Sequence, residues 1–447
     1  MAGRSSVRRR AHRTLRRALL LALLPLFRLR RTPPRGRRLR IRVLLQHAYG
    51  TGGTIRTVLN LCGHLAEEHD VEIVSVVRSH RDPFFRIPPG VTVTFADDRT
   101  EGSPVIARLP SLLTPGGEAS LRGMNLWTDL RLLRTLWRGA PDVLIGTRPS
   151  LNLLIAALAP RGTITIGQDH MNLPSYRPHL RREIVRSYGR LTALAVLTEK
   201  AQNDYEAALA GTSVRITRIP NALPELSPGG PSPRDAKVIL AAGRLVRQKG
   251  FDLLLRAYEP LAAEHPDWTL RIFGAGHQRD RLRKEIADLG LTGTVELRAR
   301  TPDLAREMRR SSIYVLSSRF EGMPMVIIEA MSLGLPVVAF DCPTGPAEMI
   351  TPDHDGLLVP PDDVTALSTA LRTLMEDATL RNRLGDEALR SAAAYDPARV
   401  AAQWRRLLTD LRENPLHPRP RIRHRRDQPP DRKGAATMTE RRSEERQ

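Results

Sequence analysis

The chain has few aromatic side chains and only two cysteines. Phenylalanine, tyrosine and tryptophan make up 4% of its 447 residues, so a core must rest on leucine, valine, isoleucine and alanine. Cys62 and Cys342 lie far apart in the sequence, and neither has a metal-ligand partner nearby. A disulfide scaffold is therefore excluded as the main source of stability, and free thiols in a reducing compartment are expected.

Long apolar runs are also lacking. The run at residues 18–27, ALLLALLPLF, has ten residues, whereas a bilayer-spanning helix needs about twenty. No small-residue cleavage site follows it, and arginines resume at once. Residues 1–38 are therefore predicted to form a basic arm that lies at an anionic membrane surface. A signal peptide, a disordered tail and a misassigned start site are the alternatives.

Acidic residues are absent from the first 42 positions, which hold fifteen arginines. Residues 412–447 carry eleven basic and six acidic side chains, so of the net charge of +22 only about +2 belongs to the body between them. The tails have little aromatic interleaving, so nucleic acid is not expected as a partner. Residues 413–447 are predicted to be a disordered charged tail. Only five of the seventy basic residues are lysines, which draws attention to Lys249.

Strand and helix patterns alternate along the body and predict an α/β protein with two domains, residues 39–222 and 235–395. The boundary at 220–234 is rich in proline. Residues 100–117 are irregular and are expected to form a mobile loop. The expected strands are 39–46, 71–77, 91–95, 142–146, 163–168 and 194–197 in the first domain, and 237–242, 270–273, 295–297, 314–317, 337–340 and 357–359 in the second.

Residues 320–338, FEGMPMVIIEAMSLGLPVV, form the most informative stretch. They follow the predicted strand 314–317, and Gly322 and Pro324 interrupt the backbone before an apolar helix pattern begins. This loop is therefore expected at the carboxyl end of a parallel strand, where ligands bind, beside a helix N-terminus. Glu321 and Glu329 are eight positions apart, so they can meet the two ends of an elongated ligand.

This stretch resembles the E-x7-E signature of retaining glycosyltransferases of family 4. Residues 243–252, GRLVRQKGFD, are similar to the family's Arg-x4-Lys-Gly motif, and residues 273–282 are similar to its second glycine turn. Residues 342–350 and 355–359 are similar to its closing loops. The resemblance covers roughly residues 42–411. It implies the GT-B fold, in which two Rossmann-like doubly wound domains face each other across a cleft, and in which a final helix, here 396–412, returns to the first domain.

The resemblance also implies roles for residues of the second domain. Arg244 and Lys249 would hold the donor's diphosphate, where fixed positive charge lowers the barrier. Glu321 would bind hydroxyls of the transferred sugar, and Glu329 those of the nucleotide ribose. Glu321 is not expected to be a direct nucleophile, because the leaving phosphate assists a same-face displacement in this family. Further residues are expected to border the same pocket: Gly322, Met323, Pro324 and Val326, the last opening the helix that faces the diphosphate.

Weaker signals add six more candidate residues. Gly52 and Gly53 allow a close approach of the backbone to a phosphate or an acceptor, although a plain turn is the alternative. His170 follows a strand end and would contact the donor sugar, with a structural histidine as the alternative. Gly274 and Gly276 would form a turn beneath the nucleotide. Arg300 would border the base.

No metal site is predicted, because the acid pairs 97–98 and 362–363 read as caps or turns. No cofactor is expected beyond the nucleotide-sugar co-substrate. The resemblance therefore implies a metal-independent retaining hexosyltransferase, and the basic arm predicts that it is peripheral at the inner face of the cell membrane. It would use a nucleotide sugar, by default a UDP-sugar, and a lipid-linked or polymeric envelope glycan as acceptor. A non-catalytic scaffold of the same fold, a sugar epimerase and a phosphorylase are the alternatives; the scarcity of lysine argues against a phosphorylase.

Overall fold

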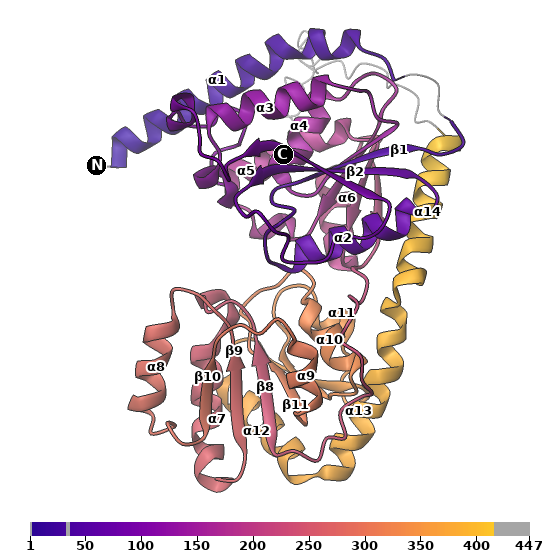
Figure 1. Cartoon of the computed structure of the whole chain (residues 1–447). Helices are drawn as coiled ribbons and strands as arrows, with labels where there is room; N and C mark the ends of the chain where they lie inside the picture. Colours follow the sequence, from indigo (N-terminus) through magenta and orange to yellow (C-terminus); the bar gives the residue numbers. More distant parts are fainter. Residues whose placement is uncertain (1, 33–35, 415–447) are drawn as a thin grey trace, which may run out of the picture. The chain divides into compact units, whose positions relative to one another are not determined.

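The computed structural model describes residues 2–32 and 36–414, which contain two parallel β-sheets covered by helices (Figure 1). The first sheet has seven strands in the order β3-β2-β1-β4-β5-β6-β7. Its strands are β1 (Arg40–Leu45), β2 (Asp70–Arg78), β3 (Val91–Asp98), β4 (Val143–Gly146), β5 (Ile164–Asp169), β6 (Ala193–Val196) and β7 (Arg215–Arg218). Its helices are α1 (Ala2–Leu29), α2 (Gly53–Ala66), α3 (Leu126–Trp137), α4 (Pro149–Leu158), α5 (Pro178–Ser187) and α6 (Glu199–Ala208).

The second sheet has six parallel strands in the order β10-β9-β8-β11-β12-β13. Its strands are β8 (Val238–Ala242), β9 (Thr269–Phe273), β10 (Val295–Arg298), β11 (Ile313–Leu316), β12 (Val337–Phe340) and β13 (Gly356–Val359). The helices between and after these strands are α7 (Phe251–Glu264), α8 (Arg279–Asp288), α9 (Leu304–Arg309), α10 (Met325–Ser332), α11 (Pro346–Met349), α12 (Val364–Glu376), α13 (Ala378–Ala392) and α14 (Pro397–Glu413).

Both sheets are doubly wound, as the sequence predicts. In each, the chain starts at a central strand, runs to one edge, and returns to the centre before it runs to the other edge. The central strands are fully buried apolar runs because helices cover both faces. The order reverses between β1 and β4 and between β8 and β11, which leaves a crevice at the carboxyl ends of these strands. The predicted site residues follow β1, β5, β8, β9, β10 and β11.

The last helix, α14, packs against the first domain although it follows the second one in the sequence. The carboxylate of Asp396 caps its start by accepting from the amides of Ala398 (2.9 Å) and Arg399 (3.2 Å). Trp404 is buried in the same apolar cluster as Leu59 of α2. Residues 413–447, which the sequence analysis assigns to a tail, lie outside the described residues from 415 onward.

The prediction of a mobile loop at 100–117 is wrong for its second half, because a buried acid anchors the chain there. The carboxylate of Asp129 in α3 accepts from the hydroxyl of Ser111 (2.8 Å) and from the amides of Leu112 (2.6 Å) and Leu113 (3.0 Å). Ser111 and Leu113 are buried. Aspartate commonly bonds nearby backbone in this way, but a partner sixteen residues away gives no local sequence signal.

The N-terminal segment also differs from the separate arm expected at residues 1–38. Residues 2–29 form α1, which packs on α4, and Phe27 joins the core of the first domain. The ring of Phe27 meets that of Trp137 edge to face, with centroids 5.2 Å apart. Among the described residues, no helix is both long enough and apolar enough to cross a bilayer. The ten-residue apolar run is therefore partly a packing surface.

Candidate active site

Two glycine turns bring the loops after β8 and β9 into direct contact. A Cβ at Gly274 would lie 2.1 Å from the carbonyl oxygen of Gly243, and one at Gly276 would lie 2.3 Å from that of Leu245. The amide of Leu245 donates to the carbonyl of Ala275 at 2.9 Å. Larger side chains at either glycine would push these backbones apart, so Gly274 and Gly276 place the turn that carries Arg244.

Lys249 is held at the end of the same loop by a third glycine. Residues Arg247–Lys249 form a short 3₁₀ turn, and Gly250 ends it with φ of 63° before α7 begins. A Cβ at Gly250 would lie 1.9 Å from the carbonyl oxygen of Ser317. Only glycine fits here, because the position combines left-handed backbone with contact to the loop after β11.

That contact joins the two loops that the sequence analysis singled out. Nζ of Lys249 lies 2.5 Å from Oε1 of Glu321, and the hydroxyl of Ser318 donates to the same oxygen at 2.6 Å. Both members of the ion pair are largely buried. Arg244 is more exposed and its Nη2 donates to the side chain of Gln248 at 3.2 Å. The predicted cation Lys249 and the predicted sugar-binding acid are therefore direct neighbours.

The backbone of Glu321 is fixed by the first domain as well as by the second. Its carbonyl oxygen accepts from Nδ2 of Asn172 at 2.7 Å and from the hydroxyl of Thr344 at 2.6 Å. A Cβ at Gly322 would lie 2.3 Å from the carbonyl oxygen of His170, so glycine is required for this approach. The segment after β5 and the loop after β11 are thus in backbone contact.

His170 is partly exposed as a residue, but both of its ring nitrogens are buried, and neither has a hydrogen-bond partner within the described ranges. Burial lowers the pKa of His170 to about 4, so the ring is neutral near pH 7. Its neighbour Asp169 accepts from the hydroxyls of Tyr176 and Tyr205, which fixes the segment that carries the histidine. Two unpaired nitrogens on a buried ring mark a position where a polar ligand group could bind.

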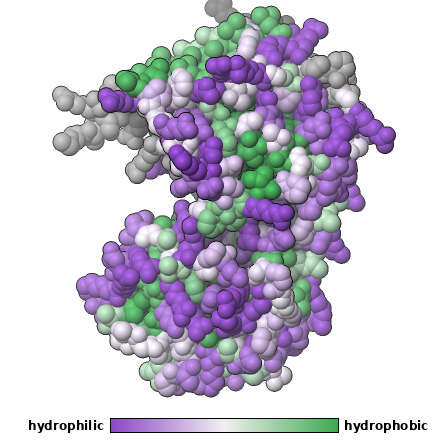
Figure 2. All heavy atoms as spheres, viewed as in Figure 1, coloured by the Kyte–Doolittle hydropathy of each residue, from purple (hydrophilic) through white to green (hydrophobic). Residues whose placement is uncertain are grey.

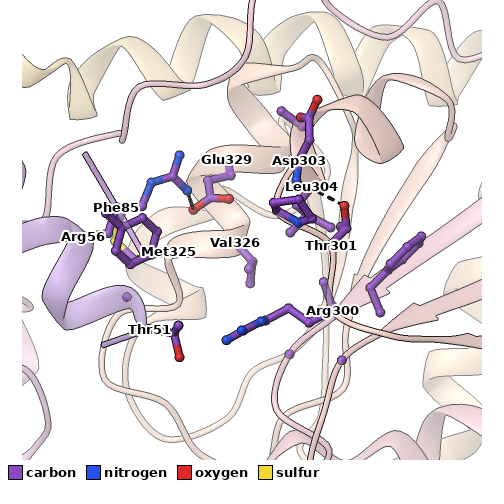
Figure 3. Close-up of a pocket in the computed structure, with 18 of the residues that line it drawn as sticks. Thr51, Arg56, Phe85, Arg300, Thr301, Asp303, Leu304, Met325, Val326 and Glu329 are labelled. Atoms are coloured by element: carbon purple, nitrogen blue, oxygen red, sulfur yellow. Dashed lines mark hydrogen bonds and ion pairs between the residues drawn. The ribbon is translucent and has the colours of Figure 1, made fainter. Parts of the chain in front are cut away.

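Glu329 lies on α10, the helix that follows the Glu321 loop, and its side chain contacts the first domain. Nη1 of Arg56 on α2 is 3.4 Å from Oε1 of Glu329, and Nη2 of Arg56 donates to the carbonyl of Glu225 at 2.6 Å (Figure 3). Burial raises the pKa of Glu329, and the charge of Arg56 opposes that rise. Because its ion pair with Arg56 is long, the Glu329 carboxylate keeps lone pairs that can accept hydrogen bonds from two neighbouring hydroxyl groups.

A cavity of about 590 Å³ lies between the two sheets and is lined by residues of both domains. Figure 3 shows Arg300 and Arg56 entering it from different elements, with Val326 and Glu329 of α10 between them. Seven predicted residues line it: Gly52, Gly53, Arg244, Gly274, Arg300, Val326 and Glu329. The other seven do not line it: Lys249, Glu321, His170, Gly276, Gly322, Met323 and Pro324.

Of the seven residues outside the cavity lining, Gly276 belongs to the turn against Leu245 described above, and the other six fall into two groups. Lys249, Glu321, Gly322 and His170 form the contacts just described, at the junction of the two domains. Pro324 precedes α10 and forms its N-cap, and the sulfur of Met323 accepts from the amide of Asn221 at 3.3 Å. Met323 therefore packs against the segment that links the domains.

Sequence reasoning missed the residues that the first domain adds to the cavity. Arg56 lies on the first turn of α2, three positions after Gly53, and Phe84 and Phe85 lie between β2 and β3. The guanidinium of Arg300 stacks on the ring of Phe84, 4.8 Å from its centroid. Adjacent aromatics in an aromatic-poor chain were the available signal for Phe84 and Phe85. No periodicity marks Arg56, because its partner is 273 positions away.

The acid pairs make structural contacts, but Asp97 and Asp98 lie at the end of strand β3 and not in a cap or turn. Asp97 is buried and accepts from Thr128 (2.6 Å) and Arg99 (2.8 Å), while the Asp98 carboxylate accepts from Thr100. Asp363 caps α12. Within residues 2–32 and 36–414, no group of three or more His, Cys, Asp or Glu side chains is placed to hold a metal ion.

Known proteins resemble this chain in sequence and in fold. Residues 224–391 match the family described as glycosyl transferases group 1. An exopolysaccharide phosphotransferase of Streptomyces coelicolor is 36% identical over 393 residues, which cover 83% of this chain and 41% of that protein. The amylovoran biosynthesis glycosyltransferase AmsD of Erwinia amylovora is 25% identical over 373 residues, 82% of this chain and 98% of AmsD.

Among solved structures, Anabaena HepE in complex with UDP and glucose aligns with a TM-score of 0.66. The alignment covers 84% of this chain and all of HepE, at 19% identity. At that identity the likeness concerns the fold, and it confirms the predicted pair of Rossmann-like domains of GT-B type. The chain spans less than half the length of the Streptomyces relative.

Proposed function

We propose that this chain, whose residues 224–391 belong to the glycosyl transferases group 1, is a retaining glycosyltransferase that moves a hexose from a UDP-sugar to a cell-envelope glycan. The observation that carries the proposal is the convergence of two loops and one helix start at the same sheet edge. The turn after β8 supplies Arg244 and Lys249, the loop after β11 supplies Glu321, and the start of α10 follows directly.

The leaving group of such a transfer gains negative charge on its diphosphate. Arg244 lines the cavity, Lys249 lies beside it at Glu321, and α10 presents its N-terminal residues Met325 and Val326 to the cavity. Fixed cations and a helix N-terminus stabilise a developing anion with little reorganisation. In the proposal these groups take the part that a divalent metal plays in other transferases, so no metal or other cofactor is required.

The two acids divide the donor between them. Glu321, next to Lys249, binds hydroxyls of the hexose, and Glu329 binds the ribose diol from within α10. A carboxylate suits both tasks because it accepts from two vicinal hydroxyls. Phe84 and Arg300 border the base. The UDP in the HepE complex supports the choice of nucleotide for this chain.

In the proposal, retention comes from a same-face displacement and not from a covalent intermediate on Glu321. Its carboxylate is paired with Lys249 and Ser318, which lowers its nucleophilicity and leaves the sugar's anomeric carbon to the acceptor. The proposal therefore places the acceptor on the face that the diphosphate leaves, with the phosphate taking the acceptor's proton. The neutral ring of His170 would contact the sugar nearby.

The proposed acceptor is a lipid-linked or polymeric glycan of the cell envelope. Support comes from the names of the two relatives, which concern an exopolysaccharide and amylovoran. The first domain would bind it, at the end of the cleft near Gly52, Gly53 and His170. A scaffold of the same fold and a sugar epimerase are the competing hypotheses.

The proposal is tested by a donor screen. UDP-glucose, UDP-galactose, UDP-N-acetylglucosamine and GDP-mannose are each incubated with the protein, with and without a lipid extract of bacterial membranes, and free UDP or GDP is measured. We expect release of UDP from one UDP-sugar, increased by the extract. A scaffold would neither bind UDP nor release it, and an epimerase would change the sugar without glycan formation; either result would overturn the proposal.

Replacing Glu329 by glutamine is expected to weaken binding of UDP-glucose by about 10- to 100-fold, because a charged hydrogen-bond acceptor contributes about 1.5–3 kcal/mol. Its raised pKa means that the carboxylate takes up a proton above the ordinary value of 4.5. Affinity of the unaltered protein should therefore fall as pH is lowered through that raised pKa, and the variant should lose this dependence. Calorimetry between pH 5 and 8 measures both, with Glu285→Gln on α8 as the control.

A further inference from the structure

The helix α1 has one face that the first domain covers. Nε of Arg16 donates to the carbonyl of Leu113 at 2.5 Å, and its Nη1 pairs with Glu183. About three turns further along the helix, Phe27 is buried in the core of the first domain. The ring of His12 contacts the carbonyl oxygen of Ser111 at 2.8 Å. These contacts fix the rotation of the helix about its axis, so they also fix which side chains face outward.

The outward face is apolar. Leu15, Leu21, Leu26 and Leu29 are 53%, 59%, 50% and 80% exposed. The small or apolar residues between them on that face, Ala18, Ala22 and Pro25, are exposed as well. Spacings of three and four residues place these side chains along one stripe. Figure 2 shows apolar side chains along the upper edge of the view, where α1 runs in Figure 1.

Arginines flank this stripe on one side. Arg13, Arg17 and Arg28 are exposed, and on a helical projection they lie between the apolar stripe and the face that packs on the domain. No acid occurs before Glu67 in the sequence. Between residues 13 and 29, the outer surface of α1 therefore combines exposed leucines with exposed arginines.

The charge decides between the possible occupants of this face. A second copy of the chain would bring one arginine flank against another without acids from α1 to separate them. A bilayer with anionic headgroups offers opposite charge to the arginines and an apolar boundary to the leucines. Scattered exposed leucines need no explanation, but four on one helical stripe do.

We propose that the outer face of α1, formed by Leu15, Leu21, Leu26 and Leu29 with Arg13, Arg17 and Arg28, docks this protein on an anionic lipid surface, with α1 lying in the plane of the interface. This goes beyond the proposed transfer reaction, since docking depends on no cleft residue. The covered face of α1 ties the first domain to the membrane as one rigid unit, so the docking surface is part of the domain and not a free arm.

The test is sedimentation of the full-length protein with vesicles of phosphatidylglycerol and phosphatidylcholine, against vesicles of phosphatidylcholine alone. Truncation before residue 40 is unsuitable, because it would uncover the core around Phe27. The variant is Leu15→Ser/Leu21→Ser/Leu26→Ser/Leu29→Ser, which alters exposed side chains. A matched control is Leu109→Ser/Leu130→Ser, two leucines of the same domain that are 51% and 45% exposed and lie off α1.

We expect the unaltered protein and the control to pellet with anionic vesicles and the fourfold variant to bind at least about tenfold more weakly. Arg13→Gln/Arg17→Gln/Arg28→Gln should weaken binding and reduce its dependence on salt. Equal partition of the fourfold variant and the unaltered protein would overturn the proposal. A second result would also overturn it: the unaltered protein runs as a dimer in size-exclusion chromatography, the fourfold variant runs as a monomer, and neither protein binds vesicles. Circular dichroism checks that all variants are folded.

Discussion

Replacing Lys249 by alanine is expected to lower kcat with the active UDP-sugar by about 10²- to 10³-fold, the range seen when a group that stabilises a developing anion is removed. The substitution removes a cation whose Nζ lies 2.5 Å from Glu321 and leaves that buried carboxylate with the hydroxyl of Ser318. Breaking a buried ion pair costs about 3–5 kcal/mol, so the midpoint of thermal unfolding should also fall. Steady-state kinetics and a thermal melt measure the two effects.

The matched control is Lys284→Ala on α8, an exposed lysine that pairs with Asp288 at 2.6 Å. It removes the same charge from the same domain and should leave kcat unchanged. Rates are compared well below the melting midpoint of Lys249→Ala, so that loss of fold does not count as loss of chemistry. Near-normal kcat in folded Lys249→Ala would mean that the diphosphate binds elsewhere.

A second large effect is expected for Glu321→Gln, which keeps the volume of the side chain but removes its charge. We expect kcat to fall on the order of 10²-fold, since a charged acceptor to sugar hydroxyls contributes about 1.5–3 kcal/mol. The loop should stay in place, because Asn172 and Thr344 hold the backbone carbonyl of this residue and not its side chain. Affinity for UDP, which lacks the hexose, should change little.

Glu329→Gln is expected to show the opposite pattern, with weaker binding of the nucleotide and a smaller change in kcat. Comparing the two variants therefore tells which acid contacts the sugar and which contacts the nucleotide. If affinity for UDP fell in Glu321→Gln as much as kcat did, then Glu321 would contact the nucleotide and the assignment of the two acids would be reversed. Glu264→Gln on α7, an exposed acid that pairs with Arg372, serves as the control for loss of a charge in this domain.

The sequence was sufficient to predict the fold because both domains are built from local patterns. Buried strands such as 143–146 and 313–316 read as short apolar runs, and glycine or proline marks the turns after them. Since the carboxyl ends of parallel strands meet at one edge, Arg244, Lys249 and Glu321 could be expected near each other. Their contact depends on Gly250, which the sequence marks as a turn, but whose fit against Ser317 only the structure reveals.

Contacts between distant segments could not be predicted in this way. Three examples are the ion pair of Arg56 with Glu329, the anchoring of residues 111–113 by Asp129, and the packing of α1 through Arg16. In each case the sequence around the residues carries no motif that indicates the contact. The apolar run in α1 predicted a separate arm at the membrane surface, whereas its side chains divide between a face buried on the first domain and an exposed face. The strand β7, with two arginines in four residues, has no apolar pattern to mark it.

The approach of Gly322 to the carbonyl of His170, together with the bond from Asn172 to the carbonyl of Glu321, has a mechanical consequence. Any hinge motion that parts the domains must pull on the peptide that carries Glu321. Release of the spent nucleotide would then disassemble the sugar subsite at the same moment. If the proposed transfer is correct, an open molecule would be poorly organised to cleave its donor.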